Sequence, residues 1–347
     1  MDRPWLAHYD PGIPASLEPY PDTTIVEVVE AAARERPQHP AILFKGRAIS
    51  YDELSRASTA FAAALAEDGV RKGDRVAIIL PNCPQYIIAE LGIWKAGGIT
   101  LGLNPTYTER ELETPLRESA ATHVVALSRF YDRVKAIQPT TSVKRVIVAN
   151  IKEYLPPLLR ALFTVFRERR EGHRVRIAPG DWTFREALAR GHGRPAPAVV
   201  VGPKDPAVVL ASGGTTGTPK GAVGLHEAYV MSGLQLRRWI ESQCAAWTDV
   251  ILLPLPLFHV YANVGVQGMA FIGRNPLALV PNPRDTGDVL ATIKKVRPAF
   301  FTAVPTLLTA LLNHPDVKSG RADFSSIKIS FSGAPPCCSR RGAASRT

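Results

Sequence analysis

The chain has 347 residues, of which 46% are apolar and 21% are charged, with 26 glycines and 30 prolines. This ordinary globular composition excludes a disordered, collagen-like or disulfide-rich miniprotein, and the length predicts about two domains or one large one. The net charge of +11 is concentrated in two stretches: residues 152–176 hold seven basic and three acidic side chains, and the last eleven residues add three arginines. A nucleic-acid-binding protein would spread its basic face over the fold, so nucleic acid is not an expected partner.

Four cysteines stand at positions 83, 244, 337 and 338, without paired CxxC motifs or zinc-finger spacing. They predict neither a structural metal site nor a disulfide framework. Residues 1–25 contain no apolar run of signal-peptide length, which predicts a reducing, cytoplasmic location. Residues 250–273 lack charged side chains, but Pro254, Pro256 and three polar residues interrupt them, so we expect a buried strand, loop and helix instead of a membrane span.

Alternating hydrophobic periods between residues 23 and 149 predict strands that alternate with helices. Such alternation is typical of an α/β fold with a doubly wound, mostly parallel sheet. The first expected elements are a helix from residue 25 that stops before Pro37, strands around a Lys45-Gly46 turn within 41–51, and a helix over 54–65. A strand at 75–80, a helix over 85–95 and a strand at 99–103 follow. A Thr108/Glu111 capping box then opens another helix, and the last expected strands lie at 123–127 and 145–149.

The segment 150–195 interrupts this alternation, so we interpret it as an insertion followed by a Gly- and Pro-rich linker. Within it, Leu158, Leu159, Leu162, Phe163 and Phe166 recur at helical spacing and precede an arginine cluster. This is the pattern of an interfacial helix, which predicts peripheral membrane contact through 155–176; a helix packed on its own domain is the alternative. The predicted divisions are therefore an N-terminal arm (1–22), a main domain (23–335) that contains the insertion, and a basic tail (336–347).

The ten residues SGGTTGTPKG, Ser212 to Gly221, follow the apolar strand AVVLA (207–211). Glycines allow a backbone to approach an anion closely, hydroxyls donate hydrogen bonds, and Lys220 adds a full positive charge, so the segment suits a polyphosphate. The spacing differs from a P-loop, because Pro219 precedes the lysine and Ala222-Val223 resumes an extended pattern.

SGGTTGTPKG resembles the phosphate loop of the adenylate-forming (AMP-binding) superfamily, which includes acyl-CoA synthetases. Four more stretches match that family in order: WKAGGITLGLNP (94–105), LPLFHVYA (255–262), AVPTLLTALLNHP (303–315) and FSGAP (331–335). The resemblance covers roughly residues 23–334. The Gly213-Gly214 pair, the Lys220-Gly221-Ala222 sequel and the insertion are similar to the long-chain fatty-acyl-CoA ligases. The resemblance implies an N-terminal domain that consists of two parallel-sheet subdomains, with ATP bound between them.

The implied reaction has two steps. A carboxylate attacks the α-phosphate of ATP and expels pyrophosphate, and the thiol of coenzyme A then displaces AMP. The resemblance implies ATP, Mg²⁺ and coenzyme A as cofactors and a fatty acid as substrate, because nothing acidic lies between residues 250 and 273 to hold an ammonium group. It assigns phosphate binding to Ser212, Gly213, Gly214, Gly217 and Gly221, catalysis to Thr215, Thr216, Lys220 and His259, Mg²⁺ to Thr216, and adenine contact to Gly333 and Ala334.

His226 also matches a family histidine, but its neighbours depart from the family pattern, so we leave it unassigned. After FSGAP the family continues with a Tyr-Gly-x-Thr-Glu motif, whose glutamate holds Mg²⁺, and a small domain that carries a catalytic lysine. This sequence instead ends PCCSRRGAASRT, a composition that a shifted reading frame through GC-rich DNA tends to produce; a genuine short paralogue with a basic tail is the alternative. We therefore expect impaired activity and an exposed sheet edge near 327–331. A nucleotide-binding or membrane-surface remnant, and a ligase for another carboxylic acid, stay open as alternatives.

Overall fold

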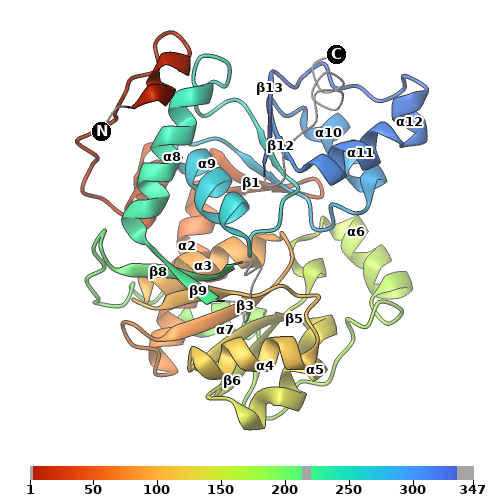
Figure 1. Cartoon of the computed structure of the whole chain (residues 1–347). Helices are drawn as coiled ribbons and strands as arrows, with labels where there is room; N and C mark the ends of the chain where they lie inside the picture. The colour runs from red at the N-terminus through yellow and green to blue at the C-terminus, as the bar shows by residue number, and fades with distance from the viewer. Residues whose placement is uncertain (1–2, 213–219, 334–347) are drawn as a thin grey trace.

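The computed structural model describes residues 3–212 and 220–333. Within them the chain forms two mostly parallel β-sheets, each covered by helices on both faces (Figure 1). Sheet A has the order β13-β12-β10-β11-β1-β2, and sheet B has the order β7-β6-β5-β3-β4-β8-β9. Every neighbouring pair is parallel except the hairpins β1–β2 and β8–β9, which form one outer edge of each sheet.

The strands of sheet A are β1 (Pro40–Phe44), β2 (Arg47–Ser50), β10 (Ile251–Leu253), β11 (Leu277–Leu279), β12 (Phe300–Ala303) and β13 (Ile329–Ser332). The strands of sheet B are β3 (Arg75–Ile79), β4 (Ile99–Gly102), β5 (His123–Leu127), β6 (Arg145–Ala149), β7 (Trp182–Thr183), β8 (Pro206–Ser212) and β9 (Lys220–Leu225).

The helices are α1 (Ile25–Glu35), α2 (Tyr51–Glu67), α3 (Pro84–Lys95), α4 (Glu109–Glu118), α5 (Tyr131–Ile137), α6 (Pro157–Leu162), α7 (Phe184–Gly191), α8 (His226–Ile240), α9 (Gly268–Ile272), α10 (Thr286–Val296), α11 (Pro305–Leu312) and α12 (Pro315–Lys318). Two π-helical segments, Phe163–Arg167 and Tyr261–Gln267, continue α6 and precede α9.

Local signals set most of these boundaries as the sequence predicts. Thr24 and Thr108 each close a capping box with the glutamate three residues later, which fixes the first turns of α1 and α4. The β1–β2 turn uses Lys45 and Gly46, both with positive φ, as a two-residue hairpin requires. The mostly parallel α/β character is therefore confirmed.

One assignment is corrected. The alternation over 23–149 predicts a single sheet, but β1 and β2 leave it and join sheet A, where Ile42 pairs with Leu277 of β11. A local pattern cannot reveal a partner so distant in sequence. The helix α5, between β5 and β6, was also not predicted.

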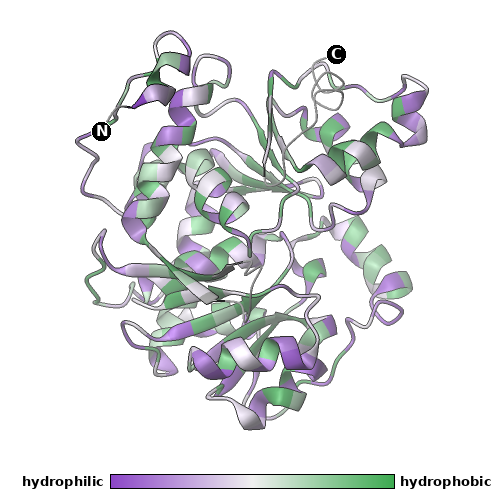
Figure 2. Cartoon of the chain, viewed as in Figure 1, coloured by the Kyte–Doolittle hydropathy of each residue, from purple (hydrophilic) through white to green (hydrophobic). Residues whose placement is uncertain are grey.

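Helix α3 links the two sheets. All twelve of its residues are buried, so it is apolar nearly all round, as a helix enclosed by other elements must be. The largest hydrophobic cluster joins α3 to strands of both sheets, while smaller clusters lie under α4 and α5 and under α10 and α11. Figure 2 shows the hydrophobic colour concentrated on the strands and the hydrophilic colour on helix surfaces such as that of α4.

Candidate active site

The candidate site lies where the carboxyl ends of strands from both sheets meet. Ligands of open α/β sheets bind outside the carboxyl ends of parallel strands, at the point where the strand order reverses. In sheet B the order reverses at β3, because the chain continues from β3 to β4 on one side and then crosses back past β3 to β5 on the other. The loop after β10 of sheet A, which contains the LPLFH stretch, runs directly over it.

Asn82, just after β3, fixes this loop. Its Nδ2 donates to the carbonyl oxygens of Leu253 (3.1 Å) and Leu255 (2.7 Å), and its Oδ1 accepts from the Leu257 N–H (2.9 Å). Tyr86, one turn into α3, donates its hydroxyl to the Leu257 carbonyl oxygen (3.0 Å). All these groups are buried, so the loop backbone obtains from α3 and its N-terminal flank the hydrogen bonds that it cannot make to water.

His259 follows this fixed loop and is exposed. The Cα of the preceding Phe258 lies 3.4 Å from the position that a Cβ on Gly102 would occupy, at the end of β4. Gly102 pairs with Leu210 of β8, two residues before the start of the predicted phosphate loop. His259 therefore lies at the carboxyl ends of β4 and β8, on the side where that loop begins.

The ends of the predicted phosphate loop are joined by the β8–β9 hairpin. Ser212 and Lys220 form the last antiparallel pair of its ladder, and Gly221 pairs with Ala211. A Cβ on Gly221 would lie 2.8 Å from Val209 Cγ1, so the close packing here requires glycine. The predicted residues Gly213, Gly214, Thr215, Thr216 and Gly217 lie outside the described residues.

Gly333, a predicted adenine contact, directly follows β13 and lies beside the same loop. Its N–H donates to the Ala303 carbonyl oxygen (3.1 Å), and a Cβ would come within 2.5 Å of the Tyr261 ring. Tyr261 is two residues beyond His259, so both predicted residues lie near one aromatic side chain. Its partner Ala334 lies outside the described part of the chain. The site assignments of individual residues thus remain predictions.

A buried polar cluster beneath the loop was not predicted. Glu90 of α3 has no exposed surface and accepts hydrogen bonds from Asn263 Nδ2 (2.8 Å) and Gln267 Nε2 (2.6 Å), while the Tyr229 hydroxyl donates to Asn263. Burial raises the pKa of Glu90 to about 7, and the two amide donors limit the rise. The sequence signal for this cluster is a lone glutamate within an apolar helical pattern. The hydrogen-bond partners of Glu90 lie 173 and 177 residues further along the chain, so no local pattern includes them.

His226, which the sequence left unassigned, opens α8 and is buried against the edge of Trp94, with ring centroids 5.4 Å apart. Burial lowers its pKa to about 4, so the ring is neutral at neutral pH. Its Nδ1 has no hydrogen-bond partner among the described residues. A neutral imidazole packed on tryptophan indicates a core role.

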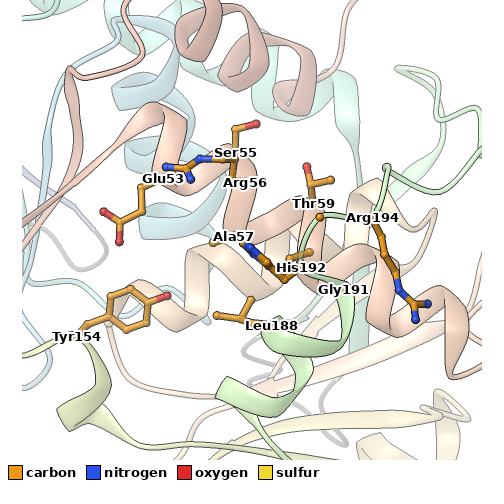
Figure 3. A pocket seen from close by; sticks show the side chains of 12 residues that line it. Glu53, Ser55, Arg56, Ala57, Thr59, Tyr154, Leu188, Gly191, His192 and Arg194 are labelled. Atoms are coloured by element: carbon orange, nitrogen blue, oxygen red, sulfur yellow. The ribbon is translucent and has the colours of Figure 1, made fainter.

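A cavity of ≈ 480 Å³ lies between α2 and α7, away from these residues. Figure 3 shows it lined by Glu53, Arg56, Tyr154 and Leu188, with His192 and Arg194 on the loop after α7. Among the described residues, none that the sequence predicts for the site lines this cavity. Among the described helices, none combines the length and apolar character needed to cross a membrane.

Comparisons with known proteins agree with the fold and motifs. The family model described as AMP-binding enzyme matches residues 29–341. The long-chain-fatty-acid–CoA ligases of Bacillus subtilis (strain 168) and Haemophilus influenzae are 30% and 34% identical to this chain. Each alignment covers 96% of this chain but only 59% and 60% of the relative, so the chain spans about 60% of the length of these relatives.

Solved structures show the same fold. A long-chain-fatty-acid-CoA ligase from Archaeoglobus fulgidus superposes with a TM-score of 0.78 at 24% identity, over 96% of this chain and 61% of that one. An anthranilate CoA ligase in complex with anthranoyl-AMP superposes with a TM-score of 0.74 at 21% identity, over 90% and 55%. Because the family model spans most of the sequence and the fold agrees along nearly its whole length, this chain belongs to the family of AMP-binding enzymes.

Proposed function

We propose that this chain forms the ATP-binding part of a long-chain fatty-acid–CoA ligase, which adenylates a fatty acid and then transfers the acyl group to coenzyme A. One observation carries the proposal. Asn82 attaches the LPLFH loop to the carboxyl end of β3, and the neighbouring strands β4 and β8 end at the same edge, where the predicted phosphate loop begins. His259 and the two ends of the predicted phosphate loop, Ser212 and Lys220, thereby lie at the carboxyl-end edge of sheet B.

The residues at this edge fit a nucleotide with its magnesium ion. The close approach of Gly333 to Tyr261 leaves backbone beside an aromatic ring, and the hairpin fixes both ends of a loop rich in amides, hydroxyls and one lysine. Ser212, Gly213, Gly214, Gly217 and Gly221 would hold phosphates. Mg²⁺ usually binds phosphate oxygens and water together with one or two protein ligands, so the Thr216 hydroxyl would be one of its protein ligands.

The roles of the side chains follow from charge. Lys220 would neutralise the pyrophosphate as it leaves, with Thr215 and Thr216 donating hydrogen bonds to it, because phosphoryl chemistry is accelerated mainly by positioned positive charge and donors. His259 would orient the incoming carboxylate or the thiol. Gly333 and Ala334 would border the adenine. Coenzyme A would supply the thiol, and we assign no residue to it.

The substrate class rests on the absence of charge around the loop. Residues 250–273 contain no acidic side chain, which favours an acid with an uncharged tail. Ligases for other acids are the second candidate, since a rice 4-coumarate–CoA ligase is 29% identical over 88% of this chain. Competition between palmitate and benzoate for the acyl site distinguishes the two.

Nucleotide binding tests the proposal. ATP with Mg²⁺ should raise the melting temperature by about 2 °C when free ATP is tenfold above its Kd, and Lys220→Ala should abolish the shift. Lys204→Ala, which removes an exposed lysine from the loop before β8, is the matched control and should keep the full shift. Equal shifts in the wild type and in Lys220→Ala would place the phosphates elsewhere.

We further propose that the 347 residues alone turn over weakly or not at all. They contain no counterpart of the family's Tyr-Gly-x-Thr-Glu motif, and losing a metal ligand or a transition-state lysine costs orders of magnitude in rate. AMP release with oleate, coenzyme A and Mg-ATP measures this directly, and turnover at ordinary ligase rates would contradict it. Peripheral membrane contact through 155–176 is part of the same proposal, because fatty acids partition into membranes.

A further inference from the structure

The helical segment 157–167 consists of α6 and the π-helical segment after it. Most of its apolar side chains face away from the protein core and are exposed. Only Phe163 is buried, at 7% exposure. The outer stripe consists of five exposed side chains: Leu158 (72%), Leu159 (42%), Leu162 (44%), Val165 (73%) and Phe166 (66%). Surface helices normally turn such a stripe inward, so this one is built to meet something outside the molecule. Figure 2 shows the hydrophobic colour along α6, on the outer side of the fold.

The underside of the segment is firmly attached. Phe163 packs edge-on against His173, with ring centroids 5.4 Å apart, and His173 Nδ1 is 2.8 Å from the Ser128 hydroxyl at the end of β5. Glu168 accepts a hydrogen bond from Asn150 Nδ2 (3.1 Å) and pairs with Lys152 (2.5 Å). The outer stripe is therefore presented by a fixed frame, and Phe163 belongs to that frame and not to the stripe.

Cations follow the stripe directly. Arg169, Arg170, Arg174 and Arg176 are exposed, and none of them forms an ion pair with another described residue. Arg167 is paired with Glu171. Apolar side chains flanked by unpaired arginines match the boundary of an anionic bilayer, where acyl chains and phosphates lie within a few ångströms of each other.

We infer that the outer stripe enters an anionic phospholipid surface while these four arginines contact its phosphates. The inference gives the membrane contact proposed above a lipid class and a set of residues, and it does not depend on catalysis. A second copy of the chain is the less favoured occupant, because a two-fold contact through the stripe would bring two arginine clusters together.

Flotation with vesicles, without ATP or coenzyme A, tests this. The wild type should float with phosphatidylcholine vesicles containing 30% phosphatidylglycerol and much less with pure phosphatidylcholine. Leu158→Glu/Phe166→Glu should lower the apparent partition constant roughly tenfold or more, since two large exposed apolar side chains no longer enter the lipid. Arg169→Gln/Arg170→Gln/Arg174→Gln should remove the preference for the anionic vesicles and its salt sensitivity.

Matched controls separate these effects from folding and from total charge. Val200→Glu alters another exposed apolar side chain, and Arg34→Gln/Arg110→Gln/Arg284→Gln removes three exposed arginines elsewhere; both should float like the wild type. All variants should keep the wild-type melting temperature, because they alter exposed side chains. Absence of wild-type flotation, or equal flotation of the stripe variant, overturns the inference. So does a dimer that dissociates only in the stripe variant. A failure of ATP binding in the earlier test would leave flotation unchanged.

Discussion

At the scale of single residues, Glu90 has the largest expected effect on pH dependence. Its folded-state pKa of about 7 lies above the ordinary glutamate pKa of 4.5, so between these pH values the folded protein binds more protons than the unfolded chain. Its contribution to stability is fully present below pH 4.5 and is lost as the pH rises through about 7. Glu90→Gln should remove this loss, so that the variant gains about 2–3 kcal/mol relative to the wild type between pH 5 and pH 8. Urea unfolding at the two pH values measures it.

The comparison must be made as a difference between proteins, because other groups titrate in the same range. Burial also raises the pKa of Glu153 to about 7 and lowers those of His173 and His226 to about 4, and these effects partly oppose one another. Glu118→Gln makes the same charge change on an exposed side chain and should leave the pH dependence unaltered. If the free energy of unfolding changes with pH in the same way in the wild type and in Glu90→Gln, Glu90 is not the titrating group.

At the scale of elements, α8 and α9 meet through two glycines. A Cβ on Gly233 would lie 2.8 Å from the carbonyl carbon and oxygen of Gly268, and one on Gly268 would lie 2.9 Å from the Tyr229 carbonyl oxygen. Backbone cannot move aside as a flexible side chain can, so Gly233→Ala should destabilise the protein by about 1–3 kcal/mol even though alanine favours helices. Gly287→Ala, in the first turn of α10 with no atom closer than 3.4 Å, is the matched control and should be neutral or slightly stabilising. Similar urea midpoints for the two variants would contradict the close crossing.

The same scale shows what the sequence could and could not predict. The capping threonines, the Lys45-Gly46 turn and the apolar run of β3 are local signals, and the structure has the corresponding elements within a few residues. The placement of β1 in sheet A and the network of Glu90 depend on contacts with residues far along the chain, for which a local pattern carries no information. For the site, motif resemblance brought His259 and Gly333 into one proposal, but Asn82, which lies between the predicted strand at 75–80 and the predicted helix over 85–95, received no role. Its position after β3, at the reversal of strand order, was the available signal.

At the scale of the whole molecule, the two sheets share one core through α3 and should unfold as a unit. Ile87 of α3 is fully buried in the cluster that reaches both sheets, so Ile87→Ala should lower the free energy of unfolding by about 2–5 kcal/mol. The urea midpoint should fall equally whether it is measured in the half that contains sheet A or in the half that contains sheet B. Single-tryptophan variants that retain Trp182, beside β6, or Trp247, against His39, report on the two halves separately. Val200→Ala, at an exposed position, should shift neither midpoint. Two separate midpoints in the wild type would show that the halves unfold independently.

The burial of α3 also has a consequence for synthesis on the ribosome. The carbonyl groups that cover its N-terminal flank belong to residues 253–257, and the strand that pairs with β1 begins at Leu277. At about 5–20 residues per second, translation supplies that covering segment roughly 8–30 s after α3 itself. During this interval residues 253–257, which bond to Asn82 and Tyr86, have not been made, although β1 and β2 of sheet A have. Transient collapse of the nascent chain or a chaperone must therefore shield α3. The contacts of α3 with residues far along the chain give the fold a high contact order.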